Sequence, residues 1–277
     1  MFKNLIIILI ITSFSLLGCK KNNPTEPDSN NTQKGWNLVW ADEFNYTGLP
    51  DSTKWRFEVG GHGWGNNELQ YYTDRRLSNA RVENDNLVIE ARKELWEGKD
   101  YTSTRLNSTG QGNWTYGRIE IKAKLPYGKG TWPALWMLAS NWTYGDGGWP
   151  ANGEIDIMEH VGYDYGWIHG SIHTTAYNHK IGTQKSGSIR FTDVATNYHI
   201  YAIEWDADTI DYYVDATKYF SFANEHKGYQ YWPFDKDFHL IFNIAVGGDW
   251  GGAQGVDPTI FPQKMLIDYV RVYKFVE

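Results

Sequence analysis

The stretch YGRIEIKAKLP, residues 116–126, decides the fold class, because apolar and charged side chains alternate along it. Ile119, Ile121 and Ala123 fall on one side of an extended chain, whereas Arg118 and Lys122 fall on the other. A period of two is that of a β-strand with one buried face and one solvated face. The stretch therefore predicts a half-buried strand of an antiparallel sheet.

Similar extended runs recur along the chain, separated by turns rich in Gly, Asn and Asp. They lie at residues 36–44, 86–92, 132–138, 167–173, 198–223, 239–246 and 265–275. No window has the apolar stripe and the caps that predict an amphipathic helix. About a dozen short strands of this kind predict an all-β domain built as a sandwich of two packed antiparallel sheets.

Composition indicates the number of domains and excludes one class of partner. The chain has 277 residues, which suits a single all-β domain, and a formal net charge of −7 without any cluster of basic residues. Nucleic-acid binding requires a basic surface, so we expect none. Aromatic residues make up 16% of the chain and include 14 Trp, more than a core needs. Some of these rings are expected on surfaces that stack against sugar rings, and the others in the core.

The N-terminal segment is predicted to be an export signal with a lipid attachment site. Lys3 precedes a mostly apolar run at residues 5–17, which is too short to span a bilayer. The run ends in SLLGC, which resembles the lipobox of bacterial lipoproteins and makes Cys19 the lipid-carrying residue; cleavage by the ordinary signal peptidase is the alternative. Residues 1–19 are thus predicted to be the signal peptide, 20–35 a flexible tether and 36–277 the folded domain.

The same segment predicts where the protein resides. We expect a bacterial lipoprotein of the outer membrane, on its periplasmic face or on the cell surface. Cys19 is the only cysteine, so the folded domain has no internal disulfide and its stability must come from its core. We expect the domain to be a monomer.

The stretch GEIDIMEHVG, residues 153–162, places three carboxylates in a run that otherwise has the composition of a buried strand. Glu154 and Asp156 are two residues apart and share a face of the strand. Glu159 would lie on the opposite face of a regular strand, but one extra residue at Met158, a β-bulge, returns it to the face of the other two. The three carboxylates are therefore predicted to line one concave surface.

This arrangement suits the hydrolysis of a glycosidic bond. Three like charges on one face raise the pKa of at least one of the carboxyl groups. One carboxylate then attacks the sugar while a protonated neighbour gives its proton to the leaving oxygen. A calcium site and a solvated acidic face are the alternatives. A calcium loop would supply adjacent Asn, Asp and carbonyl ligands rather than acids that alternate with Ile, so catalysis is favoured.

The motif GEIDIMEHVG resembles the signature of glycoside hydrolase family 16, in its bulged form. The resemblance extends over residues 36–275 through WADEF, WGNNELQYYT, TSTRLNS, YGRIEIKAKLPYGKGTWPALWML, IHGSIHT, IFNIAVGG and FPQKMLIDYVRVY. It implies a β-jelly-roll sandwich with an open substrate cleft on its concave face, and a retaining, endo-acting mechanism without a catalytic cofactor. It also implies that Glu154 is the nucleophile, Glu159 the general acid/base and Asp156 the residue that tunes the nucleophile.

Four tryptophans are candidates for substrate binding. Trp132 and Trp136 share one strand face, which fits a sugar-stacking floor, with a pair of core tryptophans as the alternative. The laminarinase pattern within the family also has tryptophans here. Trp149 precedes the catalytic motif, and Trp250 lies in the Gly-rich stretch VGGDWGG, which also suits a simple turn.

Four other residues are assigned by the resemblance alone. Asn66 and Arg105 resemble family residues that hydrogen-bond sugar hydroxyls in the non-reducing half of the cleft. His173 resembles a family histidine that hydrogen-bonds the central aspartate, with a histidine satisfied within the fold as the alternative. Asp268 resembles the side-chain ligand of a structural calcium ion on the convex side, with a plain strand-end aspartate as the alternative. A cupin-like metal site at His160, His169 and His173 is disfavoured, because no fourth ligand accompanies these histidines.

Three functions are compatible with these patterns. The blocks resemble the laminarinases most, which predicts an endo-β-1,3-glucanase with β-glucan polysaccharide as its partner. A mixed-linkage β-1,3/1,4-glucanase is the first alternative. A surface glycan-binding lipoprotein without turnover is the second, and the presence of both Glu154 and Glu159 argues against it, because binding alone needs no clustered acids.

Overall fold

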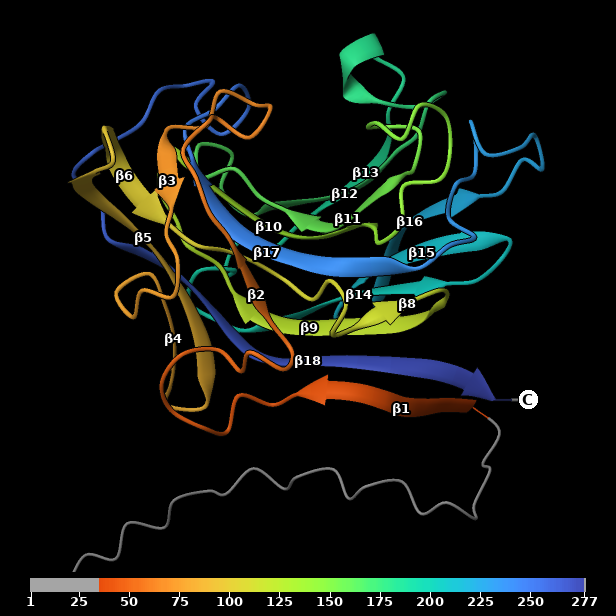
Figure 1. The fold of residues 1–277 in the computed structure, drawn as a ribbon, viewed down its shortest axis with the longest axis horizontal. Helices are drawn as coiled ribbons and strands as arrows, with labels where there is room; N and C mark the ends of the chain where they lie inside the picture. The colour runs from red at the N-terminus through yellow and green to blue at the C-terminus, as the bar shows by residue number, and fades with distance from the viewer. Residues whose placement is uncertain (1–34, 277) are drawn as a thin grey trace, which may run out of the picture.

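The computed structural model describes residues 35–276, so the predicted signal peptide, Cys19 and the tether up to residue 34 lie outside the described residues. The described chain consists of strands and one short 3-10 helix, η1 (His179–Ile181) (Figure 1). The strands are β1 (Gly35–Asp42), β2 (Arg56–Glu58), β3 (Gln70–Tyr72), β4 (Ala80–Glu83), β5 (Asn86–Trp96), β6 (Lys99–Ser103), β7 (Arg105–Asn107), β8 (Asn113–Trp114), β9 (Gly117–Lys124), β10 (Thr131–Ala139), β11 (Glu154–Glu159), β12 (Trp167–His173), β13 (Lys185–Arg190), β14 (His199–Trp205), β15 (Thr209–Val214), β16 (Thr217–Ala223), β17 (Phe238–Val246) and β18 (Gln263–Val276).

These strands form two sheets that pack face to face. The first sheet has the order β16-β15-β14-β9-β18-β5-β6-β3, with β1 added to β18 and β4 added to β5. The second has the order β13-β12-β11-β10-β17-β7-β2, with β8 added to β17. In Figure 1 the second sheet curves above the first, which contains the long strand β18. The predicted β-jelly-roll sandwich is confirmed, with one departure from antiparallel pairing: β3 and β6 run parallel.

The alternation that predicted β9 places its side chains as expected. Ile119, Ile121 and Ala123 are fully buried between the sheets, whereas the charged side chains between them are half-buried on the outer face. On that face Arg118 forms ion pairs with Glu120, at 2.7 Å, and with Glu204 on β14, at 2.6 Å. Opposite charges on neighbouring strands thus cover the outer side of a continuous apolar core.

Every predicted extended run contains a strand, but the predicted number of strands, about a dozen, was lower than the 18 found in residues 35–276. The structure adds β2, β3, β4, β6, β7, β8 and β13, several of which have only two to four residues. Such runs are too short to display a period, and their backbone pairing comes from neighbours distant in the sequence. For example, β7 lies between β2 and β17 in the sheet. Each residue of β7 is more than 40 positions away, along the sequence, from its partners on these two strands.

The centre of the second sheet is formed by β10 and β17, which pair along their whole lengths. On β17, Leu240, Phe242 and Ile244 point into the core, and the residues between them, including Asn243 and Ala245, face the other side of the sheet. That outer face is concave and carries the cleft described below. Within residues 35–276, we find no helix of the length and apolar character needed to cross a bilayer.

Candidate active site

The strand β11 carries the predicted β-bulge, but its extra residue is Ile157 and not Met158 as predicted. On β10, Trp136 pairs with Asp156 and Leu135 pairs with Met158, so Ile157 is the extra residue of β11. The register with β12 shifts at the same place, between Asp156 and Glu159. Two consecutive apolar side chains, Ile157 and Met158, are therefore buried in the core. The bulge returns Glu159 to the face that already carries Glu154 and Asp156.

These three carboxylates line a cavity of about 800 Å³ on the concave face of the second sheet. All seven predicted substrate-binding residues line it as well: Asn66, Arg105, Trp132, Trp136, Trp149, His173 and Trp250. Its volume is typical of a site that encloses a small ligand or part of a polymer. The structure thus brings together, in one cleft, predicted residues that are distant in the sequence, from Asn66 to Trp250.

An indole N–H group holds each of the outer two carboxylates. The Trp149 Nε1 atom donates to Glu154 Oε2 at 2.9 Å, and the Trp132 Nε1 atom donates to Glu159 Oε1 at 3.0 Å. In each glutamate, therefore, one carboxylate oxygen accepts a hydrogen bond from an indole and the other does not. Two of the tryptophans predicted to stack against sugar thus also orient the carboxylates, a role that strand periodicity could not indicate.

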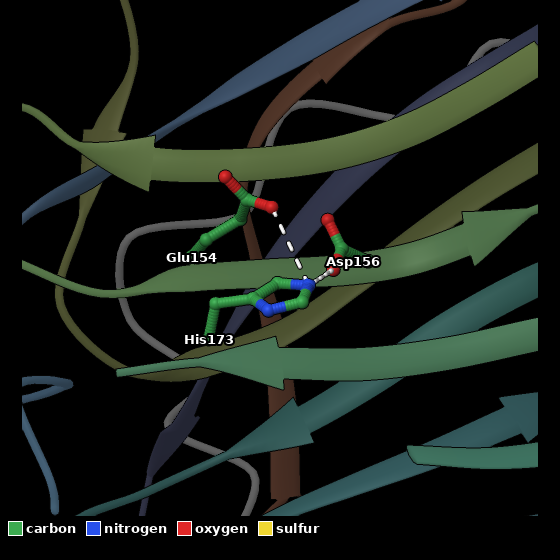
Figure 2. A group of neighbouring side chains, drawn as sticks. All are labelled: Glu154, Asp156 and His173. Carbon is green, nitrogen blue, oxygen red and sulfur yellow. Dashed lines mark ion pairs between the residues drawn. The ribbon is translucent and has the colours of Figure 1, made fainter. Parts of the chain in front are cut away.

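The central Asp156 is buried and receives two polar contacts from β12. The Ser171 hydroxyl donates to Asp156 Oδ2 at 2.9 Å, and His173 Nε2 lies 3.2 Å from the same oxygen. Figure 2 shows the His173 ring between Asp156 and Glu154, with its Nε2 atom 3.7 Å from Glu154 Oε1. The neighbouring strand β12 thus supplies the groups that fix the aspartate and link it to Glu154.

Burial raises the pKa of all three carboxyl groups above the ordinary value. For Glu154 and Glu159 the next cause is the negative charge of Asp156, which opposes their ionisation. The nearby His173 and the two indole donors act in the opposite direction. The three groups titrate as a unit, so the cluster retains protons at a pH at which separate carboxyl groups would have lost them. Such a cluster can supply both a proton donor and a nucleophile.

Part of this cluster has the spacing of a possible metal site. Glu154, Asp156 and His173 each offer one ligand atom, and these atoms lie within 4.8 Å of one another. Two of these atoms already pair with each other, because His173 Nε2 lies 3.2 Å from Asp156 Oδ2, whereas Glu154 Oε1 is 3.7 Å from the same nitrogen. Three ligands are fewer than a closed structural metal site requires. The donor set therefore suits proton chemistry without a resident ion.

The floor of the cleft is built from stacked aromatic and cationic groups. Trp132 and Trp136 lie on the cleft side of β10, while Leu135 and Met137 are buried in the core. The guanidinium of Arg105 lies 4.6 Å from the centroid of the Trp136 ring. Trp132, Trp136 and Ala134 thus share one face, as their spacing predicted, and the alternative of two core tryptophans is wrong.

Arg105 is tightly enclosed. Its guanidinium also lies 4.7 Å from the Trp64 ring, and its Nε atom forms an ion pair with Glu58. Its side chain is therefore held between two indoles, and these face contacts use none of the N–H donors at the edge of the guanidinium group. Cation–π contacts of this kind favour an arginine over a lysine.

A buried network behind Trp136 was not found from the sequence. The Trp136 Nε1 atom donates to Asn243 Oδ1 at 2.8 Å, and the Asn243 amide donates to the Tyr72 hydroxyl at 3.0 Å. That hydroxyl donates to Glu68 Oε2 at 3.0 Å, and Gln70 donates to the same oxygen at 2.6 Å. Burial raises the pKa of Glu68. The only signal in the sequence is the presence of polar residues in strands that are otherwise buried.

Other lining residues were also missed by the sequence analysis. They are His62, Trp64, Trp142, His179, Lys180, Gln184 and Asp249. Lys180 of η1 lies 4.8 Å from the Trp149 ring centroid, so this short helix overhangs the Glu154 end of the cleft. These residues belong to loops or to the short helix η1, whose positions have no periodic signal in the sequence.

Asp268 does not line the cleft. It lies on β18, at a register shift between Ile267 and Tyr269, and its Oδ2 atom is 2.9 Å from Lys122 Nζ on β9. A lysine ammonium thus already neutralises this carboxylate. This ion pair argues against a calcium site centred on Asp268.

Comparison with known proteins identifies the family. The model of the glycosyl hydrolases family 16 matches residues 66–271, which include the whole catalytic strand. The chain belongs to glycosyl hydrolases family 16. The match covers most of the cleft lining, from Asn66 to Trp250.

Several known proteins are similar to the chain over most of its length. A beta-glucanase of Rhodothermus marinus is 55% identical over 267 residues, which are 95% of this chain and 92% of the relative. The X-ray structure of the laminarinase from Rhodothermus marinus is 57% identical with a TM-score of 0.87, covering 87% of this chain and 98% of that one. The crystal structure of SCLam, a non-specific endo-beta-1,3(4)-glucanase, is 51% identical with a TM-score of 0.82, covering 87% and 92%.

Proposed function

We propose that this family 16 protein is a retaining, endo-acting glycoside hydrolase that cleaves β-1,3-glucan, with Glu154 as nucleophile and Glu159 as general acid/base. The observation that carries this proposal is the bulge in β11, which places both carboxyl groups on one face inside a cleft lined by tryptophans. The likeness to a laminarinase and a beta-glucanase supports the substrate.

The first step breaks the glycosidic bond. The Glu154 carboxylate attacks the anomeric carbon, while the carboxylic acid of Glu159 gives its proton to the leaving oxygen. Trp149 fixes Glu154 Oε2 by a hydrogen bond, so Oε1 is the oxygen suited to attack. The products are a glycosyl ester on Glu154 and a shortened glucan with a free hydroxyl group.

The second step regenerates the enzyme. The Glu159 carboxylate takes a proton from a water molecule, which attacks the anomeric carbon and displaces Glu154. Two inversions leave the configuration of the sugar unchanged. Asp156 disfavours a second negative charge beside it, which favours a protonated Glu159 at the start of the cycle. His173 and Ser171 hold Asp156 in place, and two carboxyl groups suffice without a catalytic cofactor.

The substrate assignment is tested by product analysis. The domain formed by residues 36–277 is incubated with laminarin, barley β-glucan, lichenan and agarose, and the products are separated by chromatography. We expect fast release of short oligosaccharides from laminarin. Faster cleavage of barley β-glucan would move the assignment to a mixed-linkage enzyme, an activity that the likeness to SCLam favours as the second candidate. Binding without any product would instead support a glycan-binding protein.

The roles of the two glutamates can be separated chemically. Glu154→Gln should lower turnover by about 10³-fold or more while binding is retained, because an amide keeps the shape but cannot attack. With an activated aryl glycoside, azide should rescue Glu154→Ala to give an α-glycosyl azide and Glu159→Ala to give a β-glycosyl azide. Exposed Glu97→Gln, outside the cleft, is the matched control. Near-normal turnover by Glu154→Gln would contradict the assignment.

The ion pair between Asp268 and Lys122 argues against a structural calcium ion bound at Asp268. We expect the melting temperature of the domain to be the same after dialysis against EDTA and after addition of CaCl₂. A rise with calcium that Asp268→Asn abolishes would restore the predicted structural ion.

We also propose that Cys19 carries a lipid that anchors the protein in the outer membrane, and that the folded domain is a monomer. The apolar run and the sequence SLLGC support the lipid anchor. Labelled palmitate should enter the full-length chain but not Cys19→Ser, and fractionation with surface proteolysis identifies the membrane face. Light scattering of the domain measures its oligomeric state, for which a dimer mass would contradict the proposal.

A further inference from the structure

A second concave site lies outside the catalytic cleft. We call it the tyrosine pocket and define it by Tyr116, Tyr144, Tyr229, Trp232, Asp208 and Asp235, which contribute to its lining. Its volume is about 420 Å³, and none of its lining residues lines the catalytic cleft. Small-ligand sites commonly have volumes of about 300–1,000 Å³.

Four separate connections converge to form this pocket. Tyr116 lies between β8 and β9, and Tyr144 lies in the loop between β10 and β11. Asp208 belongs to the turn between β14 and β15, and Tyr229 belongs to the segment between β16 and β17. The β14–β15 turn and the β16–β17 segment lie at the right end of the sandwich in Figure 1. Such a convergence is built by the tertiary fold and not by a single loop.

The aromatic rings of the pocket are held in fixed positions. The rings of Tyr144 and Tyr229 stack with centroids 4.8 Å apart and planes at 6°. The Tyr144 hydroxyl donates to both oxygens of Asp235, at 2.8 and 3.0 Å. Tyr116 has a φ of 66°, a conformation rare for a side chain of this size, and its ring packs edge-on against Trp205. Ordered aromatic faces of this kind can receive a ligand at a low entropic cost.

The polar groups of the pocket favour a neutral ligand with hydroxyl groups. The Trp232 side chain is buried, and its indole N–H has no acceptor among the described residues. That nitrogen atom is itself out of contact with solvent, so the pocket offers aromatic faces and acceptors rather than this donor. The carboxylates of Asp208 and Asp235 are exposed hydrogen-bond acceptors that would repel an anionic glycan. Among the described residues the pocket has no group of three side chains close enough to hold a metal ion.

We propose that the tyrosine pocket is a second binding site for the β-glucan chain, separate from the catalytic cleft. The inference rests on the proposed function, because it takes the substrate class from it. The loop between β10 and β11 links the two sites, since Trp142 and Trp149 line the cleft and Tyr144 lines the pocket. Tyr144 is only two residues from Trp142, so the pocket begins close to this part of the cleft lining. Binding at two sites raises the apparent affinity for a glucan chain long enough to reach both. The affinity for an oligosaccharide that reaches only the cleft is unchanged.

The test compares polymer with oligosaccharide. The variant Tyr229→Ala is made in the Glu154→Gln background, so that substrate is bound but not consumed. Its dissociation constant for long laminarin chains, from affinity electrophoresis, should rise about 2- to 10-fold, the range expected for the loss of one aromatic contact. Its dissociation constant for laminaritetraose, from calorimetry, should not change. Tyr229→Phe should restore polymer binding, because no hydrogen bond of the Tyr229 hydroxyl is found in the described chain.

A matched control is available on the same domain. Tyr127 is exposed and lines neither cavity, so Tyr127→Ala removes an equivalent ring without touching either site. Unchanged polymer binding by Tyr229→Ala, with tetraose still bound, would overturn the tyrosine pocket. Weaker binding of both ligands would show that Tyr229 supports the cleft, which also overturns a separate site. Failure of the Glu154→Gln parent to bind either ligand would instead contradict the proposed function.

Discussion

Replacement of Asp156 by Asn should shift the pH profile of the enzyme to lower pH. The substitution keeps the size of the side chain, and the Ser171 hydroxyl can still donate to the amide oxygen, but it removes one negative charge. That charge is the largest cause, after burial, of the raised pKa of Glu154 and of Glu159. Because the repulsion disappears, both glutamates should lose their protons at a lower pH than in the wild type.

The size of the effect follows from the geometry. A carboxylate oxygen of Glu154 lies within 4.8 Å of one of Asp156. Two unit charges at that separation repel by about 3 kcal/mol at an effective dielectric constant of about 20. The His173 ring between them reduces this value. We therefore expect both limbs of the profile to move down by about 1 to 2 pH units, with kcat/KM at pH 8 lowered about 10- to 100-fold.

The assay is the kcat/KM for laminari-oligosaccharide hydrolysis between pH 4 and 9. Asp249→Asn is the matched control, because Asp249 also lines the cleft but is held by Asn67 at 2.8 Å and is no cause of the raised pKa values. Activity of Asp156→Asn should approach that of the wild type toward pH 5. A uniform loss at every pH, with both limbs unmoved, would refute the argument and assign Asp156 to positioning alone.

Three further substitutions test other parts of the site. The hydrogen bond from the Trp132 indole lowers the pKa of Glu159. Trp132→Phe keeps a ring but removes this bond, so the pKa of Glu159 should rise and the basic limb of the pH profile should move to higher pH. Asn243→Leu removes the acceptor of the Trp136 indole, so KM should rise about 5- to 20-fold with kcat little changed. An equal fall in kcat and in kcat/KM would contradict this prediction. Gly162→Ala would place a Cβ atom 1.8 Å from a backbone carbonyl oxygen of the β9–β10 connection; thermal unfolding should show a loss of about 3 kcal/mol or more.

Much of the fold follows from local patterns. The alternation of Ile119 and Ile121 with charged residues is a property of one strand, so it can be recognised without knowledge of its partners. The bulge in β11 was predicted for the same reason: a spacing of five between Glu154 and Glu159 can place both on one face only if one residue is added. Short strands such as β7 could not be predicted, because they have too few residues to show a period.

The sequence by itself therefore determined the sandwich, the catalytic strand and the tryptophan floor, since each depends on residues close together along the chain. Only the tertiary structure decided that the indole of Trp149 holds Glu154, that Arg105 lies between Trp64 and Trp136, and that four connections form the tyrosine pocket. These contacts join segments whose separation is set by strand order, register and loop conformation. The period of a single strand carries no information about which distant strand pairs with it, so contacts of this kind exist only once the sheets have assembled.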